Sequence, residues 1–276
     1  MQHPLRKRLV RGLAQAAVAT LLLGGCAAPG SNPPASNPAA VSAELRQVLA
    51  PTGKLRAGLY PGTPTSYLRE GNATPRGVGF ELGRELARRL GVPYEPVVFS
   101  KNAEVLAAVA TGKVDVAFTN FSAARAREMD FSAPYLDIEL GYLVGPGSPV
   151  RSLDDVDQPG VRVGVTEHSS SDAVLSRELK NARVLRSTTV GEGVTMLANR
   201  QVDAYATNKA TLFEMADALP GGKVLDGRWG LERHAVAIPK GRDAGREYVR
   251  AFAADVKANG LVREAARRAG LRGMAQ

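Results

Sequence analysis

The sequence is poor in cysteine and histidine and has no long apolar run. Its single cysteine, Cys26, excludes a disulfide framework within the chain. Its three histidines, one of them in the first few residues, are too few for an ordinary zinc site without cysteine. No apolar run reaches the roughly 18 residues that a membrane-spanning helix needs, and no Gly-x-Ser-x-Gly nucleophile motif occurs. We therefore expect no polytopic membrane protein, no nucleophilic hydrolase, and no metal or cofactor.

The composition that remains is that of an ordinary globular protein. Hydrophobic residues make up 44% and charged residues 23% of the 276 residues, which suits two domains with cores of their own. The net charge of +9 is inflated by Arg6, Lys7, Arg8 and Arg11, which leave a modest excess of five on the rest of the chain. Other basic residues alternate with acids, as in Arg127-Glu128, so binding to nucleic acid is not expected.

The N-terminus has the pattern of an export signal. A basic start is followed by an apolar stretch, Gly12 to Leu23, and then by small residues. Leu23-Gly24-Gly25-Cys26 resembles the bacterial lipobox, which implies that Cys26 is lipidated and becomes the first residue of the mature chain. The alternative is a plain signal peptide with an incidental cysteine. Uncharged Ala, Pro, Ser and Asn residues follow and indicate a flexible tether. We predict a signal peptide over residues 1–25 and a tether over 26–44.

Short strands and amphipathic helices alternate along the rest of the chain. In the helix expected over 81–90, Leu82, Leu86 and Leu90 recur every four residues, and Gly91 ends it. Strands are expected at 54–60, 97–99, 114–118, 161–165, 183–185 and 202–206. Further helices are expected at 103–110, 171–179, 191–198, 245–258 and 261–269. Such alternation favours parallel sheets flanked by helices, and the restart near residue 161 favours two lobes.

Four stretches carry a resemblance to a known family. They are the opening strand Gly53–Gly58, the segment Gly77–Leu82, the segment Gly112–Asp115 with Arg125 and Asp130-Phe131-Ser132-Ala133-Pro134-Tyr135, and a last group at 163–165, 202–204 and 237–241. Together they resemble bacterial extracellular solute-binding proteins of family 3, the amino-acid-binding class of ABC importers. The spacing from the arginine to the Asp-Phe-Ser-x-Pro-Tyr block is the most specific part of the resemblance.

The resemblance implies an α/β fold of the type II periplasmic-binding-protein kind. Each lobe would hold a mainly parallel sheet flanked by helices, and two crossover strands would form the hinge. Lobe 1 would comprise residues 45–136 plus 233–276, and lobe 2 residues 137–232. A small ligand would bind in the cleft, the lobes would close on it, and an ABC permease would recognise the closed monomer.

The resemblance also implies which residues bind a carboxylate. Arg125, six residues before Phe131, stands where the family has the arginine that binds the ligand's α-carboxylate, and Arg127 is its rival. A guanidinium suits this role because it binds carboxylate bidentately and stays charged without water. Ser169 and Ser170 lie between a strand and a helix, where hydroxyl and backbone N–H groups attract anions. One of these serines serving only as a helix N-cap is the alternative, and the two roles are compatible.

Four further residues complete the expected binding site. Thr119 and Asn120 follow the strand that ends at Phe118, at the end of the sheet where α/β proteins collect ligands. Phe99 matches an aromatic residue that packs on ligand side chains, although an ordinary core position would explain it as well. Tyr60 stands where some members have an acid.

Asn208 is the main departure from the family pattern. It stands where amino-acid binders usually have an aspartate that pairs with the α-ammonium group, and an asparagine provides no countercharge. Because burying an unpaired ammonium is costly, either another acid substitutes or the ligand is not a standard α-amino acid. Glu167 and Glu232 are the acids nearest to this position when the chain is matched to the family pattern, so either could substitute for the aspartate.

These observations predict an extracytoplasmic solute-binding lipoprotein that captures a small carboxylate-bearing ligand, an amino acid or a similar molecule. The lipid anchor would hold it at a membrane in the periplasm, and Ala27 after the cysteine favours the outer membrane in a cell that has one. The alternatives are a periplasmic dehydratase-like enzyme acting on a carboxylate, with Glu167 and His168 as acid and base, or a ligand sensor with the same fold.

Overall fold

The computed structural model describes residues 41–69 and 71–275. The predicted signal peptide, the predicted lipidation site Cys26 and most of the predicted tether lie outside these residues. The first described helix, α1 (Ala43–Leu49), begins two residues before the predicted start of lobe 1 at 45. Its N-cap is Ser42, whose hydroxyl accepts a hydrogen bond from the N–H of Leu45 at 3.0 Å.

The first half of the sheet is parallel, as the alternation of strands and helices predicts. Strands β2 (Tyr94–Val98), β1 (Leu55–Leu59) and β3 (Val116–Asn120) pair in that order. Helices α2 (Val78–Leu90) and α3 (Asn102–Ala110) connect them. The predicted leucine stripe of α2 is fully buried, and Gly91 ends the helix with a left-handed φ of 68°. A 3₁₀ turn, η1 (Arg125–Arg127), and the short strand β4 (Met129–Phe131) follow.

The second half repeats the parallel arrangement. Strands β8 (Ala204–Asn208), β6 (Arg162–Thr166) and β7 (Arg183–Ser187) pair in that order. The turn η2 (Leu153–Asp155) precedes them, and α4 (Ser170–Glu178) and α5 (Val190–Ala198) connect them. Helix α6 (Lys209–Asp217), which the sequence pattern did not predict, follows β8 directly, and the two-residue strand β9 (Lys223–Val224) pairs with β5.

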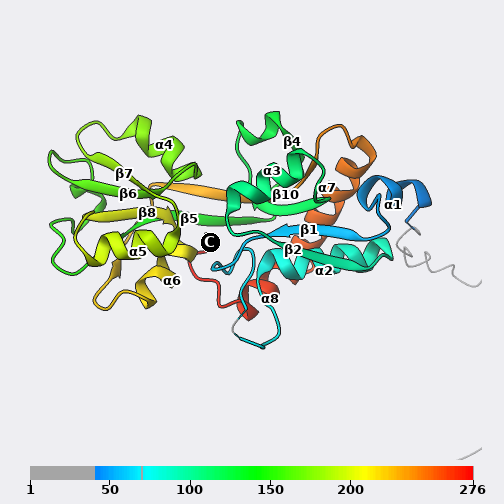
Figure 1. Ribbon diagram of the computed structural model, residues 1–276, viewed down its shortest axis with the longest axis horizontal. Helices are drawn as coiled ribbons and strands as arrows, with labels where there is room; N and C mark the ends of the chain where they lie inside the picture. The colour runs from blue at the N-terminus through cyan, green and yellow to red at the C-terminus, as the bar shows by residue number, and fades with distance from the viewer. Residues whose placement is uncertain (1–40, 70, 276) are drawn as a thin grey trace, which may run out of the picture. The chain divides into compact units, whose positions relative to one another are not determined.

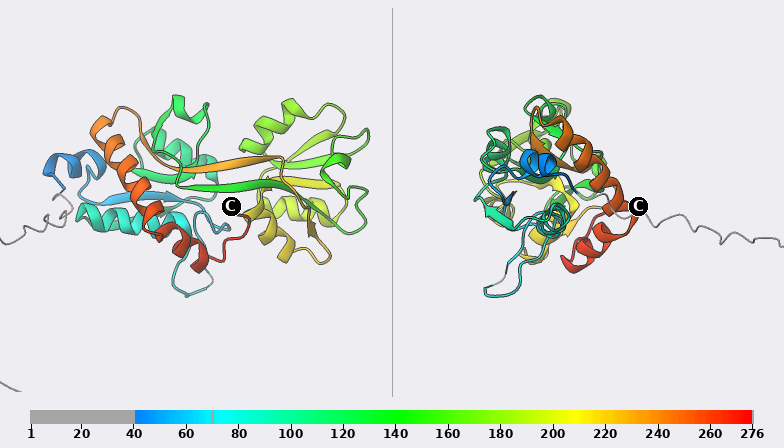
Figure 2. Two further views of the ribbon diagram at one scale, coloured as in Figure 1. Left: turned by 180° about the vertical axis from the view of Figure 1, so that it is seen from behind. Right: turned by 90° about the vertical axis from the view of Figure 1, so that its right-hand side faces the viewer.

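Two long antiparallel strands join the halves. β5 (Leu136–Val144) and β10 (Gly230–Pro239) pair with each other, and they place β3 and β8 on their outer sides. The resulting order is β2-β1-β3-β10-β5-β8-β6-β7, with β4 paired to β10. Figures 1 and 2 show the green β5 and the orange β10 running side by side from one group of helices to the other. This arrangement confirms the predicted α/β fold class with two crossover strands.

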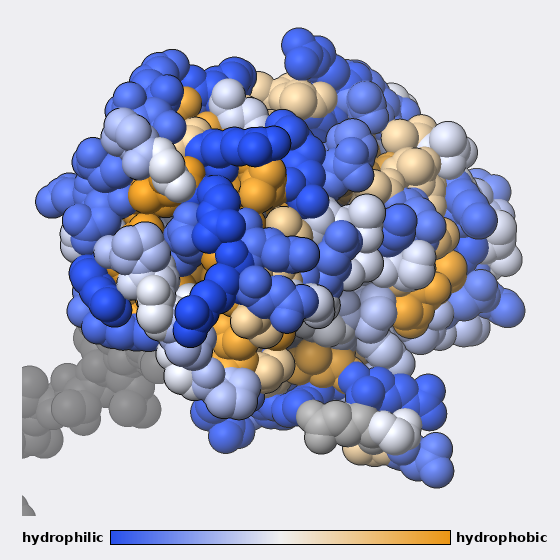
Figure 3. Space-filling model, turned by 60° about the vertical axis from the view of Figure 1, so that its left-hand side comes forward, coloured by the Kyte–Doolittle hydropathy of each residue, from blue (hydrophilic) through white to orange (hydrophobic). Residues whose placement is uncertain are grey.

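Each half of the sheet has its own hydrophobic clusters. The first half, covered by α2, α7 (Asp243–Ala258) and α8 (Leu261–Arg268), buries a large cluster that includes Leu82, Val116 and Phe252. The second half buries two clusters, around Val163 and around Tyr205. On the face that Figure 3 shows, hydrophobic residues form small separate patches among hydrophilic ones. None of the helices in residues 41–69 and 71–275 is long and apolar enough to span a membrane.

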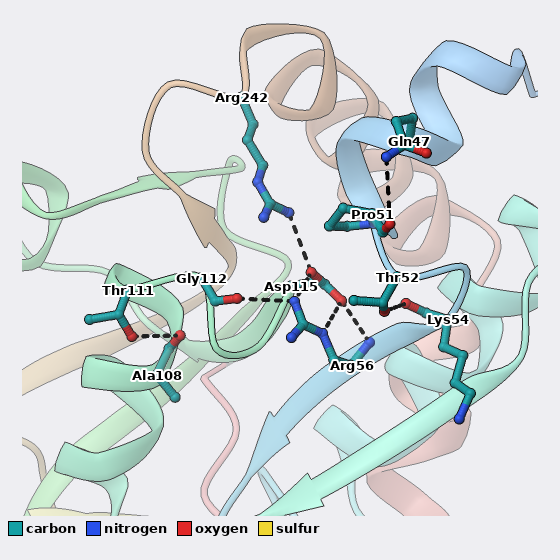
Figure 4. Close-up of polar contacts among 10 residues, drawn as sticks. All are labelled: Gln47, Pro51, Thr52, Lys54, Arg56, Ala108, Thr111, Gly112, Asp115 and Arg242. Atoms are coloured by element: carbon teal, nitrogen blue, oxygen red, sulfur yellow. Dashed lines mark hydrogen bonds and ion pairs between the residues drawn. The ribbon is translucent and has the colours of Figure 1, made fainter.

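The same arginine–aspartate clamp fixes the first strand of each half. Asp115 accepts hydrogen bonds from the backbone N–H (3.0 Å), Nε (2.9 Å) and Nη2 (2.7 Å) of Arg56. Asp203 accepts the same three bonds from Arg162, at 2.8, 3.0 and 2.7 Å. Figure 4 shows the carboxylate of Asp115 between Arg56 and Arg242, whose Nη1 lies 3.6 Å from it.

A C-terminal strap, residues 271–275, runs from α8 to the second half of the molecule. The carbonyl oxygen of Gly273 accepts a hydrogen bond from the N–H of Glu139 (2.9 Å), and the N–H of Ala275 donates to the carbonyl oxygen of Asp137 (3.0 Å), both on β5. Arg272 lies over the Phe213 ring of α6 at 4.9 Å and forms ion pairs with two acids of the same helix. The strap thus ties α8, which packs on α2, to α6.

Candidate functional site

A cavity of about 500 Å³ lies where the carboxyl ends of the parallel strands of both halves meet. In open α/β sheets ligands collect at this end of the strands, because loops and helix N-termini converge there. Residues at or just after the ends of five strands line it: Tyr60 after β1, Asn120 at the end of β3, Thr166 at the end of β6, Thr188 after β7 and Asn208 at the end of β8.

Arg125 lines this cavity and is held in place by the end of β3. Its Nη1 donates to the hydroxyl of Thr119 (3.2 Å), to the carbonyl oxygen of Asn120 (3.0 Å) and to the side-chain oxygen of Asn120. Burial lowers the pKa of Arg125, and nearby Glu232 opposes this effect. Because the ordinary pKa of an arginine is far above 7, the guanidinium of Arg125 still remains charged at neutral pH. Arg127, the rival, is exposed and is not among the residues that line the cavity.

The N-terminus of α4 also lines the cavity. It belongs to the second half of the molecule, whereas Arg125 belongs to the first. Ser169 is the N-cap, and its hydroxyl accepts a hydrogen bond from the N–H of Asp172 at 3.0 Å. Ser169 and Ser170 both line the cavity. The first N–H groups of a helix have no partner inside the helix, and its dipole attracts anions. The cap role and the lining position therefore coexist at Ser169.

His168 precedes this helix in a left-handed backbone conformation, with φ of 61°. Non-glycine residues seldom adopt this conformation, which is why glycine is common at such positions. The imidazole is exposed, and its Nε2 lies 3.6 Å from Oε1 of Glu167, which is also largely exposed. The backbone N–H of His168 donates a hydrogen bond to the carboxylate of Asp172 at 3.1 Å.

Asn208 lines the cavity and caps α6. It is only 6% exposed, and its side-chain oxygen accepts a hydrogen bond from the N–H of Thr211 at 2.9 Å. This oxygen, the atom with which an asparagine would accept a bond from an ammonium group, is therefore already engaged by the helix.

Of the remaining predicted residues, Tyr60 and Asn120 line the cavity, whereas Thr119 and Phe99 are not among its lining residues. Burial raises the pKa of Tyr60 to about 12, with Glu232 contributing, so its hydroxyl is a neutral donor. The hydroxyl of Thr119 accepts a hydrogen bond from the guanidinium of Arg125. The Phe99 ring packs against a small core cluster and lies 5.5 Å from Nζ of Lys113.

Several lining residues were not singled out from the sequence. Six of them follow an expected strand or precede an expected helix and could have been found from that position alone: Ser100, Lys101, Asn102, Thr166, Thr188 and Thr189. Thr211 lies on α6, which the sequence pattern did not predict. The cavity wall also holds three acids, Glu167, Glu214 and Glu232. In residues 41–69 and 71–275, no three His, Cys, Asp or Glu residues are grouped as a metal ion would require.

Comparison with known proteins agrees with this geometry. Residues 55–270 match the family model of bacterial extracellular solute-binding proteins, family 3. The glutamine-binding protein of a Bacillus subtilis ABC transporter is 24% identical over 247 residues, which cover 88% of this chain and 89% of that protein.

Solved structures of similar fold include a lysine complex and an ancestral amino acid-binding protein. A binding component of an ABC transporter from Wolinella succinogenes, complexed with lysine, is 26% identical with a TM-score of 0.70, covering 78% of this chain and 95% of that chain. An ancestral amino acid-binding protein, a precursor of cyclohexadienyl dehydratase, is 23% identical with a TM-score of 0.69, covering 82% and 98%. At this identity the second structure shows the fold alone.

Proposed function

The chain belongs to the bacterial extracellular solute-binding proteins of family 3, and on that premise we propose that it binds an amino acid or a closely similar carboxylate for an ABC importer. The observation that carries this proposal is the placement of Arg125 and the α4 N-terminus on the wall of one cavity. A half-buried guanidinium and the N–H groups at the start of α4 together provide charge and donors for one carboxylate group. The glutamine and lysine that two similar proteins bind both carry such a group.

The two halves of the sheet act as lobes that close on the ligand. The proposed lobe 1 is 45–136 plus 233–276 and lobe 2 is 137–232, with β5 and β10 as the hinge. Separate hydrophobic clusters in the two halves and a cavity lined by both support this division. Closure would bring α4 toward Arg125. Small-angle scattering should then give a smaller radius of gyration with saturating ligand than without, and an unchanged radius would contradict closure.

The protein works outside the cytoplasm, as expected for an extracellular solute-binding family, and we propose Cys26 as its lipid anchor. The lipobox-like Leu23-Gly24-Gly25-Cys26 and the uncharged segment after it support this. Mass spectrometry of the mature chain should show a lipidated Cys26, and C26A should release the protein or leave it unprocessed. An unmodified Cys26 in the mature chain would contradict the anchor.

Binding rather than catalysis is the proposed role. Glu167 and His168, the pair that the sequence offers as acid and base, have exposed side chains, whereas Arg125 is half-buried. The purified protein should bind its carboxylate ligand and return it chemically unchanged, which mass spectrometry of the recovered ligand checks. Turnover of a carboxylate substrate would favour an enzyme.

The central experiment is a binding screen with two matched variants. The purified protein is tested with the standard L-amino acids by thermal shift and calorimetry, since a ligand that binds the folded state stabilises it. R125A should weaken binding by about 2–5 kcal/mol, the range for truncating one partner of a buried hydrogen-bonded charge pair. R127A, two residues away and exposed, should leave binding unchanged. Equal effects of the two variants would place the ligand elsewhere.

A further inference from the structure

The register of the sheet brings Glu232 to the wall that holds Arg125. Side chains two residues apart on a strand share a face, so Glu232 and His234 of β10 point to the same side. His234 pairs with Asn120 of β3, and residues directly opposite in an antiparallel pair also share a face. Asn120 is the residue whose side chain holds Arg125. Glu232 therefore lies beside Arg125, and its charge opposes the lowering of the Arg125 pKa that burial causes.

The carboxylate of Glu232 is largely buried and makes no direct ion pair with an arginine or lysine of the described chain. Its side chain is 10% exposed and lines the cavity. Among residues 41–69 and 71–275, its one ion-pair contact is Nε2 of His234, at 3.8 Å. His234 is fully buried, and burial lowers its pKa, so the imidazole is neutral at neutral pH. A largely buried carboxylate that lacks a directly paired cation is costly, and a cationic ligand group would reduce that cost.

The other two acids of the cavity wall are less suited to this task. Glu214 of α6 forms an ion pair with Arg272 of the C-terminal strap, at 3.3 Å. Glu167 is 44% exposed and lies beside His168 in the loop before α4. Asn208 has no charge, and its oxygen caps α6. Glu232 is thus the one acid lining the described cavity that is largely buried and makes no direct ion pair with an arginine.

We propose that Glu232 binds the α-ammonium group of the ligand while Arg125 binds its α-carboxylate, so that the ligand is a zwitterionic α-amino acid. This assignment rests on the proposed function. Glu232 takes the role that Asn208 cannot fill, and it does so from strand β10 instead of from the end of β8. Since Arg125 and Glu232 are neighbours without a direct ion pair in the described chain, a ligand that carries both charges fits between them.

The test compares each amino acid with the same molecule lacking the α-amino group. Wild-type protein, E232Q and the matched control E167Q are titrated by calorimetry with L-glutamine and 4-carbamoylbutanoate, and with L-lysine and 6-aminohexanoate. Any other standard amino acid that the binding screen identifies is paired with its own des-amino acid in the same way. Thermal unfolding without ligand shows whether each variant is folded. E232Q removes the charge and keeps the size of the side chain.

We expect wild type to prefer the amino acid over its des-amino partner by about tenfold or more, which is about 1.4 kcal/mol. E232Q should lose most of this preference, mainly through weaker binding of the amino acid, and E167Q should keep it. An amino acid that binds wild type and E232Q with the same preference would overturn the assignment while leaving the proposed function intact. Failure of wild type to bind any standard L-amino acid would overturn this assignment, and failure to bind any of the des-amino carboxylates as well would contradict the proposed function.

Discussion

Asp115 accepts hydrogen bonds from both the backbone N–H and the guanidinium of Arg56, which ties the start of β1 to the segment just before β3. Asp203 and Arg162 repeat this relationship between β6 and β8. The two clamps differ in burial, because the Asp115 side chain is fully buried whereas that of Asp203 is 12% exposed.

We predict that D115A destabilises the protein more than D203A does. Removing Asp115 leaves Arg56 without its partner in a buried position, and breaking a buried pair costs about 3–5 kcal/mol. D203A should cost less, since the Arg162 side chain is 39% exposed and water can replace the lost bonds. Urea unfolding of the two variants measures the difference. An equal loss in both would show that burial does not set the strength of the clamp.

Asn208 provides a test that separates capping from ligand binding. N208A removes the hydrogen bond to the N–H of Thr211 and should lower the free energy of unfolding by about 1 kcal/mol, as for other N-caps. N208D keeps an acceptor at the same place and should retain the stability, while its charge should favour ligands that carry an α-ammonium group. Chemical unfolding and calorimetry on both variants check this. Loss of stability in N208D equal to that in N208A would contradict the capping role.

Glu85 on α2 predicts an acid-dependent contribution to stability. It accepts hydrogen bonds from Arg88 and Arg89, and these bonds lower its pKa from 4.5 to about 2. A carboxyl with a lowered folded-state pKa stabilises the protein above its unfolded pKa, and this contribution disappears as the pH falls through the folded value.

The variant E85Q should therefore be less stable than wild type by about 1 kcal/mol at pH 7, a modest figure because the arginines are partly exposed. The difference between the two proteins should shrink as the pH falls from about 4.5 to 2. Unfolding curves at a series of pH values give the measurement. A difference that stays constant down to pH 2 would exclude this linkage.

Two glycines near the C-terminus allow a matched test of the strap. Gly270 and Gly273 both have left-handed φ angles, 67° and 79°, so alanine is strained at either position. A Cβ at Gly270 meets nothing, whereas one at Gly273 would lie 2.5 Å from Cβ of Lys209 and 3.2 Å from the backbone nitrogen of Ala210. G270A should cost about 1–2 kcal/mol through the backbone alone.

G273A should cost about 1–3 kcal/mol more, since the strap must shift away from α6. Hydrogen exchange should show faster exchange at the start of α6 and at the N–H of Glu139 in G273A but not in G270A. The same exchange pattern in both variants would show that the strap does not hold α6.

The sequence predicted those elements whose pattern is local. The leucines of α2 and the apolar runs of β1, β3 and β6 were sufficient, because each buries a regular face. Helix α6 was missed since it starts directly after β8, without glycine or proline between them, and its buried residues, Ala210, Thr211, Leu212 and Met215, mix small, polar and apolar types. The strands β5 and β10 came only from the family resemblance.

The candidate site shows the same limit. Arg125 was found by its spacing from Phe131, and the structure separates it from Arg127 by exposure. The sequence named Glu232 together with Glu167 as nearest acids but did not choose between them. That choice depends on which face of β10 a side chain occupies and on what lies opposite, and both follow from strand pairing between residues far apart in the chain.

The central place of β10 also governs the order in which the chain can fold. β3 needs β10 as its neighbour, yet β10 begins at Gly230, long after β3 ends at Asn120. During synthesis, which starts at the N-terminus, one edge of β3 therefore stays unpaired until the chain has grown past β10. Such non-local pairing slows folding and leaves strand edges open to aggregation. β5 likewise keeps one edge unpaired until β10 arrives, so β10, the last strand along the described chain, completes both halves of the sheet at once.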